Sequence, residues 1–152
     1  MRRTVLVLMV MVATLVVASG VALAVTRIGT DGPDTLRGTD GADQLVGKGG
    51  NDVLLALAGN DNLLGGPGAD QVVGEGGDDV LFGGSSRDFL YGYAGSDVMY
   101  GGDGNDVLLG SWGRAERDLL FCGKGSRDEY GADPNDYVSS SCEVKTGWGI
   151  ID

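Results

Sequence analysis

Residues 65–73 read Gly-Gly-Pro-Gly-Ala-Asp-Gln-Val-Val, and residues 101–109 read Gly-Gly-Asp-Gly-Asn-Asp-Val-Leu-Leu. Both stretches have the form G-G-x-G-x-D-x-U-x, in which U is a large aliphatic residue. The aspartate of this unit recurs at a fixed step of nine residues along most of the chain. The series is Asp34, Asp43, Asp52, Asp61, Asp70, Asp79, Asp88, Asp97 and Asp106. Such a constant period indicates a repeat architecture in which each unit is one supersecondary element.

Two other positions keep the same phase as the aspartates. A large apolar residue stands two positions after each aspartate, from Leu36 to Leu108. A glycine stands five positions before it in every unit except one, where Ala56 replaces it. These first glycines of the units are Gly29, Gly38, Gly47, Gly65, Gly74, Gly83, Gly92 and Gly101. Because glycine adopts positive φ freely and lets its carbonyl point inward, we expect six turn residues and a three-residue strand in each unit.

The repeat resembles that of the repeat-in-toxin (hemolysin-type) family, whose nonapeptide G-G-x-G-x-D-x-U-x binds calcium in its turns. The resemblance covers roughly residues 28 to 138, and residues 65–73 and 101–109 match the pattern fully. It implies an all-β fold, a right-handed parallel β-roll (β-solenoid). Ala56 and Ser86 stand where the pattern has glycine, so we expect their turns to be strained or to bind calcium less well.

A nine-residue unit makes half a coil, so aspartates 18 residues apart are expected to stack in two ladders. One ladder would start at Asp34 and the other at Asp43. Neighbouring strands lie roughly 4.8 Å apart, and carboxylates stacked at that spacing repel one another. Calcium between successive turns would remove the repulsion, because it takes six to eight oxygen ligands in flexible geometry.

The predicted ligands are the ladder aspartates and the first glycines of the units. The gaps between successive rungs allow several calcium ions, up to about seven. Magnesium suits the turns less well, because it demands a tighter octahedral shell. Aspartate is also an ordinary turn former, but a whole series in phase with an apolar position favours metal ligation.

The N-terminal segment differs from the repeats. Two arginines precede an apolar stretch from Val5 to Val17, and Ala22-Leu23-Ala24 fits the small-residue pattern of a cleavage site. We therefore predict a secretory signal peptide over residues 1–24 and a secreted, extracellular mature chain. A retained membrane anchor is the alternative, because residues 5–25 are nearly long enough to span a bilayer.

Charge and composition exclude several classes of function. Without residues 1–24 the chain has 9 basic and 22 acidic residues, a net charge of −13. Such a chain repels nucleic acid and anionic membranes, so we expect neither nucleic-acid binding nor stable membrane insertion after cleavage. The sequence has no histidine and offers no nucleophile–base pair, so we predict no catalytic residue and no enzyme activity.

The repeats end before the chain does. Residues 25–121 form the predicted roll, and residues 122–152 form the predicted degenerate coils and cap. Asp118 follows Asp106 by 12 residues, so a three-residue insertion is expected between residues 112 and 117. Cys122 and Cys142 are an even pair in an exported chain, which favours one disulfide. A solenoid needs a cap over its last core layer, and we expect the disulfide to close it.

Outward strand positions become more apolar along the chain, from Thr35 and Gln44 to Phe82, Tyr91 and Tyr100. This stripe is either a surface for self-association or another partner, or a set of aromatics that stabilise the sheets by stacking. We predict an extracellular, non-catalytic structural or interaction module whose folding is coupled to calcium. The alternative is an adhesin-like module that binds a surface, glycan or protein through the stripe.

Overall fold

The computed structural model describes residues 23–111 and 116–146, and every regular element within these ranges is a β-strand. The predicted signal peptide, residues 1–24, lies almost wholly outside the described residues. In chain order the strands are β1 (Thr26–Ile28), β2 (Thr35–Arg37), β3 (Gln44–Val46), β4 (Val53–Ala58), β5 (Asn62–Pro67), β6 (Gln71–Gly76), β7 (Val80–Ser85), β8 (Phe89–Ala94), β9 (Val98–Asp103), β10 (Val107–Leu109), β11 (Leu119–Lys124), β12 (Glu129–Gly131), β13 (Tyr137–Val138) and β14 (Val144–Lys145).

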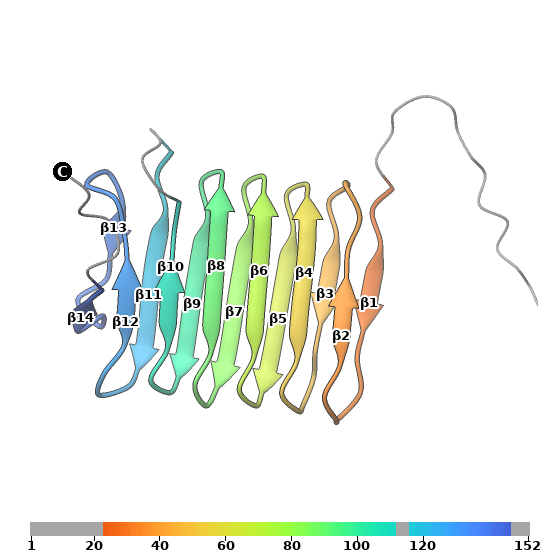
Figure 1. Ribbon diagram of the computed structural model, residues 1–152, viewed down its shortest axis with the longest axis horizontal. Coiled ribbons are helices and arrows are strands. Elements are labelled where there is room, and N and C mark those ends of the chain that lie inside the picture. Colours follow the sequence, from red (N-terminus) through yellow and green to blue (C-terminus); the bar gives the residue numbers. More distant parts are fainter. Residues whose placement is uncertain (1–22, 112–115, 147–152) are drawn as a thin grey trace, which may run out of the picture.

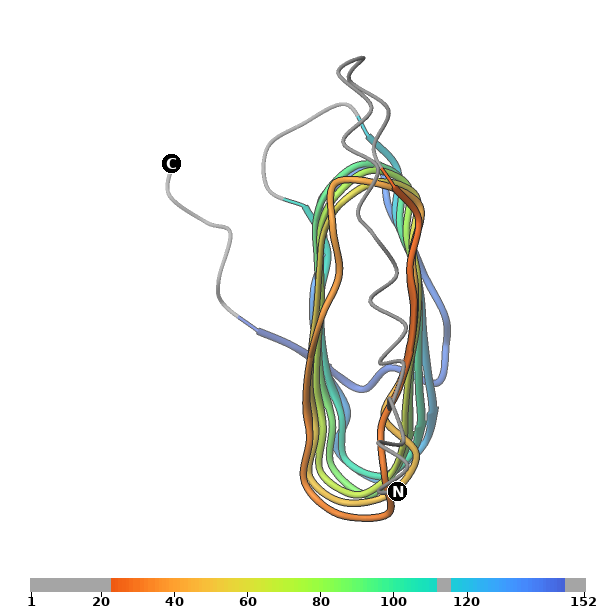
Figure 2. The ribbon, with the colours of Figure 1, turned by 90° about the vertical axis from the view of Figure 1, so that its right-hand side faces the viewer.

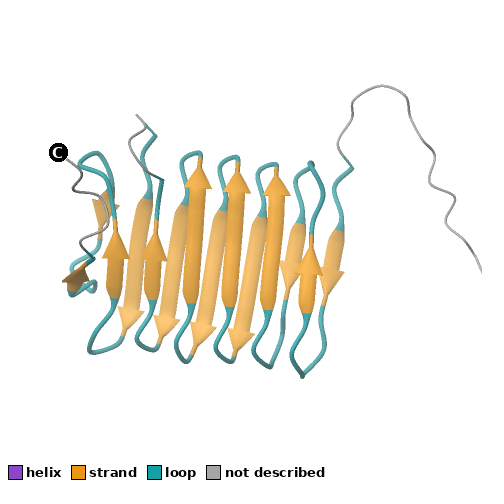
Figure 3. Cartoon of the chain, in the orientation of Figure 1, coloured by secondary structure: helices purple, strands orange, loops and turns teal. Residues whose placement is uncertain are grey.

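The strands form two parallel seven-stranded sheets, one from the odd-numbered and one from the even-numbered strands (Figure 1; Figure 3). Leu63 pairs with Leu81 and Leu54 pairs with Val72, so neighbouring strands of a sheet are 18 residues apart. Seen along the coil axis, the coils superpose as one flattened ring (Figure 2). Two nine-residue units therefore make one coil, and the predicted parallel β-solenoid is confirmed.

The strands are longer than predicted in the middle of the molecule. Each strand from β4 to β9 has six residues, whereas we expected three. The additional residues are the first three of each turn, which pair with the same turn residues one coil away, as Glu75 pairs with Tyr93. Identical turns in register let these backbone groups continue the parallel ladder, which reasoning on one isolated unit could not show.

The core consists of aliphatic side chains from both sheets, one row from each, which meet between the sheets. The U residues from Leu45 to Leu120 are buried, and two first-position side chains, Ala56 and Cys122, extend the cluster. These positions point inward because strand residues alternate between the two faces, and the first turn position continues that alternation. The core is therefore only two side chains thick.

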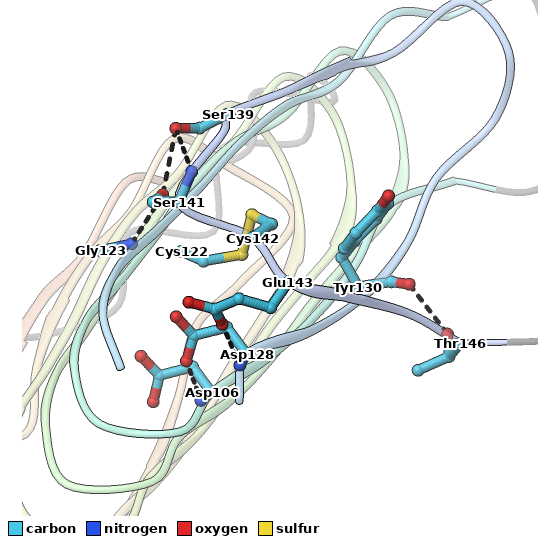
Figure 4. Close-up of a disulfide and its surroundings, with 10 residues drawn as sticks. All are labelled: Asp106, Cys122, Gly123, Asp128, Tyr130, Ser139, Ser141, Cys142, Glu143 and Thr146. Carbon is cyan, nitrogen blue, oxygen red and sulfur yellow. Dashed lines mark hydrogen bonds between the residues drawn. A yellow bond between two sulfur atoms is a disulfide. The ribbon is translucent and has the colours of Figure 1, made fainter. Parts of the chain in front are cut away.

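The C-terminal region departs from the 18-residue step as expected. Leu119 pairs with Val98, 21 residues earlier, which confirms the three-residue insertion. Cys122 and Cys142 form the predicted disulfide, with their Cα atoms 5.1 Å apart (Figure 4). Because the side chain of Cys122 lies in the core, the disulfide attaches the C-terminal segment around Cys142 to the C-terminal end of the core. Within residues 23–111 and 116–146, no helix could cross a membrane.

Candidate metal centres in the turns

The turns depend on residues in the left-handed backbone region. The second turn position has positive φ at Lys48, Leu57, Glu75 and Tyr93 as well as at several glycines. The fourth turn position also has positive φ in most units. Ser86 replaces glycine there and has φ 85°, which bears out the strain expected at that substitution. In these conformations the backbone of each turn pairs with the backbone of the same turn in the neighbouring coil.

One carboxylate oxygen of each ladder aspartate after Asp34 accepts a hydrogen bond from the backbone of the preceding coil. Oδ1 of Asp70 accepts a hydrogen bond from the N–H of Asp52 at 2.8 Å, and Oδ1 of Asp88 accepts from Asp70 at 2.8 Å. The second ladder repeats this pattern with Asp79 and Asp97. The predicted stacking of aspartates 18 residues apart is therefore observed, and hydrogen bonds from the backbone N–H groups orient the stacked carboxylates.

The other carboxylate oxygen is buried without a hydrogen-bond partner in most rungs. This holds for Oδ2 of Asp52, Asp61, Asp70, Asp79, Asp88, Asp97, Asp106 and Asp128. The ladder carboxylates themselves are almost completely buried, with 0 % of Asp88 and Asp97 exposed. An unpaired buried carboxylate oxygen is costly, so a row of them indicates a missing ligand of opposite charge.

The first glycine of each unit leaves the space beside Oδ2 open. An ideal Cβ on Gly83 would lie 2.5 Å from Oδ2 of Asp88 and 2.6 Å from the carbonyl oxygen of Gly101. On Gly101 it would lie 2.5 Å from Oδ2 of Asp106 and 2.6 Å from the carbonyl oxygen of Cys122. At these glycines, any side chain would therefore fill the space that lies between the carboxylate and the backbone carbonyl.

The buried carboxyls resist ionisation. Burial raises the pKa of Asp79, Asp88 and Asp97 to about 7, and that of Asp106 to about 6. The hydrogen bond from the preceding coil lowers each pKa in part, and neighbouring carboxylates raise it further. Removal of water and mutual repulsion both disfavour the charged form, so a cation beside Oδ2 would stabilise it.

The donor set fits a hard cation with oxygen ligands. Among the described residues no three carboxylates or cysteines converge on one point, so each centre would combine one carboxylate with backbone carbonyls. Carboxylate and carbonyl oxygens are the ligands that calcium takes. The residues present therefore fit calcium, with Oδ2 from one coil and the first-position carbonyl of the next coil on either side of the space.

The predicted site residues occupy equivalent places, with two exceptions at the N-terminal end. Gly29 and Gly38 lie beside Asp34 and Asp43 as in the other units, but Oδ2 of these two aspartates already accepts hydrogen bonds from Thr30 and Thr39. In the unit of Asp61, Ala56 brings a Cβ to the position that glycine leaves open elsewhere.

Sequence reasoning did not assign four rungs to the ladders. Oδ1 of Asp118, Asp128 and Asp136 and Oε2 of Glu143 accept the same backbone hydrogen bond from the coil before, and Figure 4 shows those of Asp128 and Glu143. The spacing is 21 residues at Asp118, 22 at Asp128 and 15 at Glu143, and Asp136 follows the displaced Asp118 by the regular 18, so the step counted from Asp34 and Asp43 meets none of them. The signal available was the motif Asp-x-apolar, as in Asp118-Leu119-Leu120.

Comparison with protein-family models finds the RTX calcium-binding nonapeptide repeat in four copies, at residues 28–63, 46–81, 56–90 and 82–114. Together the copies cover more than half of the chain. No match was found among curated proteins or among solved structures. The repeat spacing, the parallel solenoid and the matched family model agree, and the chain belongs to the family of the RTX calcium-binding nonapeptide repeat.

Proposed function

We propose that this chain is an exported, non-catalytic module that binds several calcium ions in its turns and folds when it binds them. The observation that carries the proposal is the row of buried Oδ2 atoms without a partner, six of which lie beside a space that the first glycine of the unit leaves open. The family supplies calcium binding in a structural β-roll. The ladder aspartates and first-position carbonyls are the proposed ligands.

Coupling of folding to calcium follows from the thin core. A core of two side chains between the sheets buries little apolar surface, while ordering each residue costs roughly 1–2 kcal/mol. Burial of uncompensated carboxylates adds a further cost that a cation would offset. Because the binding site exists only in the folded coils, the free energy of calcium binding becomes free energy of folding.

Export is supported by the N-terminal segment of the sequence and by the oxidised cysteine pair. A disulfide persists in oxidising compartments, and Cys122 and Cys142 are joined. Extracellular calcium modules typically bind at Kd around 10⁻⁴–10⁻³ M, so such a chain would remain unfolded before export and fold outside.

A calcium titration followed by far-UV circular dichroism tests the proposal on residues 25–152, the proposed mature chain. We expect a cooperative gain of β signal at sub-millimolar to millimolar calcium, reversed by chelator, with magnesium as the ionic control. A chain carrying Asp70→Asn and Asp88→Asn should need more calcium for the same signal. A spectrum that chelator leaves unchanged would contradict the coupling.

A second candidate function uses the outer face of the odd-numbered sheet. Phe82 stacks on Tyr100 with ring centroids 4.8 Å apart, and Tyr100 stacks on Phe121 at 5.0 Å. Phe82 and Tyr100 remain 38 % and 37 % exposed, and Leu64 continues the stripe. An exposed apolar stripe on an acidic protein favours an adhesin-like contact with a surface, glycan or protein.

Substitutions in the stripe separate the two candidates. Tyr100→Ser together with Phe82→Ser should abolish self-association or surface binding under the second candidate and leave calcium affinity unchanged, and Tyr91→Ser on the other sheet should have no such effect. Sedimentation velocity and binding to the producing cells provide the readouts, with Thr35→Ser as an outward control substitution. If neither property changes, the rings serve the sheet alone through cross-strand stacking.

A further inference from the structure

The ladder carboxylates fall into two classes that differ at Oδ2. In both classes, apart from the first rung Asp34, Oδ1 accepts an N–H of the preceding coil, as at Asp52 and at Asp118. In the open class, which includes Asp52, Asp70 and Asp88, Oδ2 has no partner. In the closed class Oδ2 accepts hydrogen bonds from its own turn; this class comprises Asp34, Asp43, Asp118 and Asp136.

In three closed turns the group that caps Oδ2 is a hydroxyl residue. The N–H and the Oγ1 hydroxyl of Thr30 donate to Oδ2 of Asp34 at 2.6 and 2.8 Å. Thr39 makes the same pair of contacts to Asp43. Beyond the regular repeats, the N–H and hydroxyl of Ser111 donate to Oδ2 of Asp118 at 2.7 and 3.1 Å.

Backbone conformation explains why the open turns lack this cap. Thr30 and Thr39 hold the second turn position, where the open turns have positive φ, as at Lys48 (79°) and Glu75 (74°). Thr30 and Thr39 do not adopt that conformation, which is strongly disfavoured for a β-branched residue. The N–H of the threonine then reaches the carboxylate, and the hydroxyl adds a second donor.

The rest of the cradle is the same in both classes. An ideal Cβ on Gly29 would lie 2.5 Å from the carbonyl oxygen of Gly47 and 2.7 Å from Oδ2 of Asp34, close to the values at Gly83. The glycine, the carbonyl and the carboxylate are therefore all in place around Asp34. Around Oδ2, the two donors from Thr30 distinguish this turn from that of Asp52; Asp34, in the first coil, is also less buried.

We propose that threonine or serine beside the carboxylate closes a turn to calcium, so that Asp34, Asp43 and Asp118 hold no ion. This inference rests on the proposed calcium binding. A cation at a closed turn must displace two hydrogen bonds that already satisfy Oδ2, whereas a cation at an open turn satisfies an oxygen that has none. The turns with an open Oδ2 and glycine at the first position belong to Asp52, Asp70, Asp79, Asp88, Asp97 and Asp106.

Calcium stoichiometry tests the proposal, measured by equilibrium dialysis and elemental analysis of the purified protein. Thr30→Gly with Thr39→Gly should bind about two more ions than the unsubstituted chain, one for each opened turn. Thr26→Gly is the matched control, because Thr26 is an exposed strand residue that makes none of the contacts to Oδ2, and it should leave the stoichiometry unchanged. An unchanged stoichiometry in the folded double variant would overturn the inference.

A second pair of variants decides the question if the glycine variant does not fold. Asp34→Asn with Asp43→Asn should leave the number of bound ions unchanged, whereas Asp52→Asn with Asp70→Asn should lower it by about two. Equal losses in both pairs would overturn the inference but leave calcium binding intact. An unsubstituted chain that binds no calcium would instead overturn the proposed function.

Discussion

In the middle coils, from β4 to β9, one oxygen of each ladder carboxylate is buried without a partner, whereas at the N-terminal end the equivalent oxygens accept hydrogen bonds from threonine. A middle coil has a neighbour on both sides, so its buried groups cannot reach water. The first coil has a neighbour on one side only. The same repeat therefore satisfies its carboxylates with its own hydroxyls at the end, whereas in the middle it leaves them to the cation that we propose.

The apolar core shows the same contrast between middle and ends. In the middle, Leu81, Leu90 and Met99 are completely buried between coils. At the N-terminal end Arg27 stands at the position paired with Leu45, so the inward row begins with an exposed, charged residue in place of an aliphatic one. At the C-terminal end the Cys122–Cys142 disulfide closes the core. Each end therefore carries a feature that prevents another coil from adding to it.

The largest expected effect comes from truncating a core residue in the middle. Leu81→Ala should lower the free energy of unfolding in saturating calcium by about 3–4 kcal/mol, because the closely packed coils cannot collapse around the cavity. Leu36→Ala in the half-buried first coil should cost about 1 kcal/mol. Urea unfolding measures both. Equal losses would show that the first coil is as well packed as the middle.

A smaller effect is expected from opening the C-terminal end. Cys122→Ala with Cys142→Ala removes a cross-link between residues 20 apart in sequence. The loop-entropy estimate for such a cross-link is roughly 3 kcal/mol of folding free energy, and fraying of the C-terminal end should reduce the loss. Hydrogen exchange should become faster in β11–β14 and stay slow in β5–β8. The contrary outcome, uniform acceleration over all coils, would mean that the solenoid unfolds as one cooperative unit.

Much of this architecture could be predicted from the sequence because the repeat is regular. The nine-residue step alone fixes the 18-residue register that pairs Leu63 with Leu81, and the even cysteine count indicated the disulfide. The length of the middle strands could not be predicted, because it depends on pairing between identical turns such as those of Glu75 and Tyr93. That pairing appears only when coils are stacked.

The candidate sites were predicted as a class but not individually. Aspartates in phase identified the ladders, yet the pattern gave Asp34 and Asp52 the same role. The two turns differ at the second position. Lys48 adopts a left-handed conformation and carries no hydroxyl, whereas Thr30 does not adopt it and donates its hydroxyl to Asp34. A consensus motif treats that position as variable. Asp128 and Glu143 were not assigned as rungs because their spacings of 22 and 15 residues differ from the regular 18.

A last contrast is the effect of pH on the calcium-free chain, and it should differ in sign between middle and end. In the middle, the raised pKa values of about 7 at Asp79, Asp88 and Asp97 mean that the folded coils bind protons the unfolded chain does not hold. Stability without calcium should therefore rise as pH falls from 8 to 5. At the end, hydrogen bonds from Thr30 lower the pKa of Asp34, so its contribution is lost only below about pH 4.

Far-UV circular dichroism in chelator at pH 8 and pH 5 measures this difference. We expect more β signal at pH 5, and a calcium midpoint that moves to higher concentration there, because protons and calcium compete for the same carboxylates. Asp88→Asn with Asp97→Asn should weaken the pH response, while Asp34→Asn should not alter it between pH 8 and 5. A response of undiminished size in the first variant would show that Asp88 and Asp97 are not among the titrating groups, whereas a reduced response is expected because Asp79 and Asp106 remain.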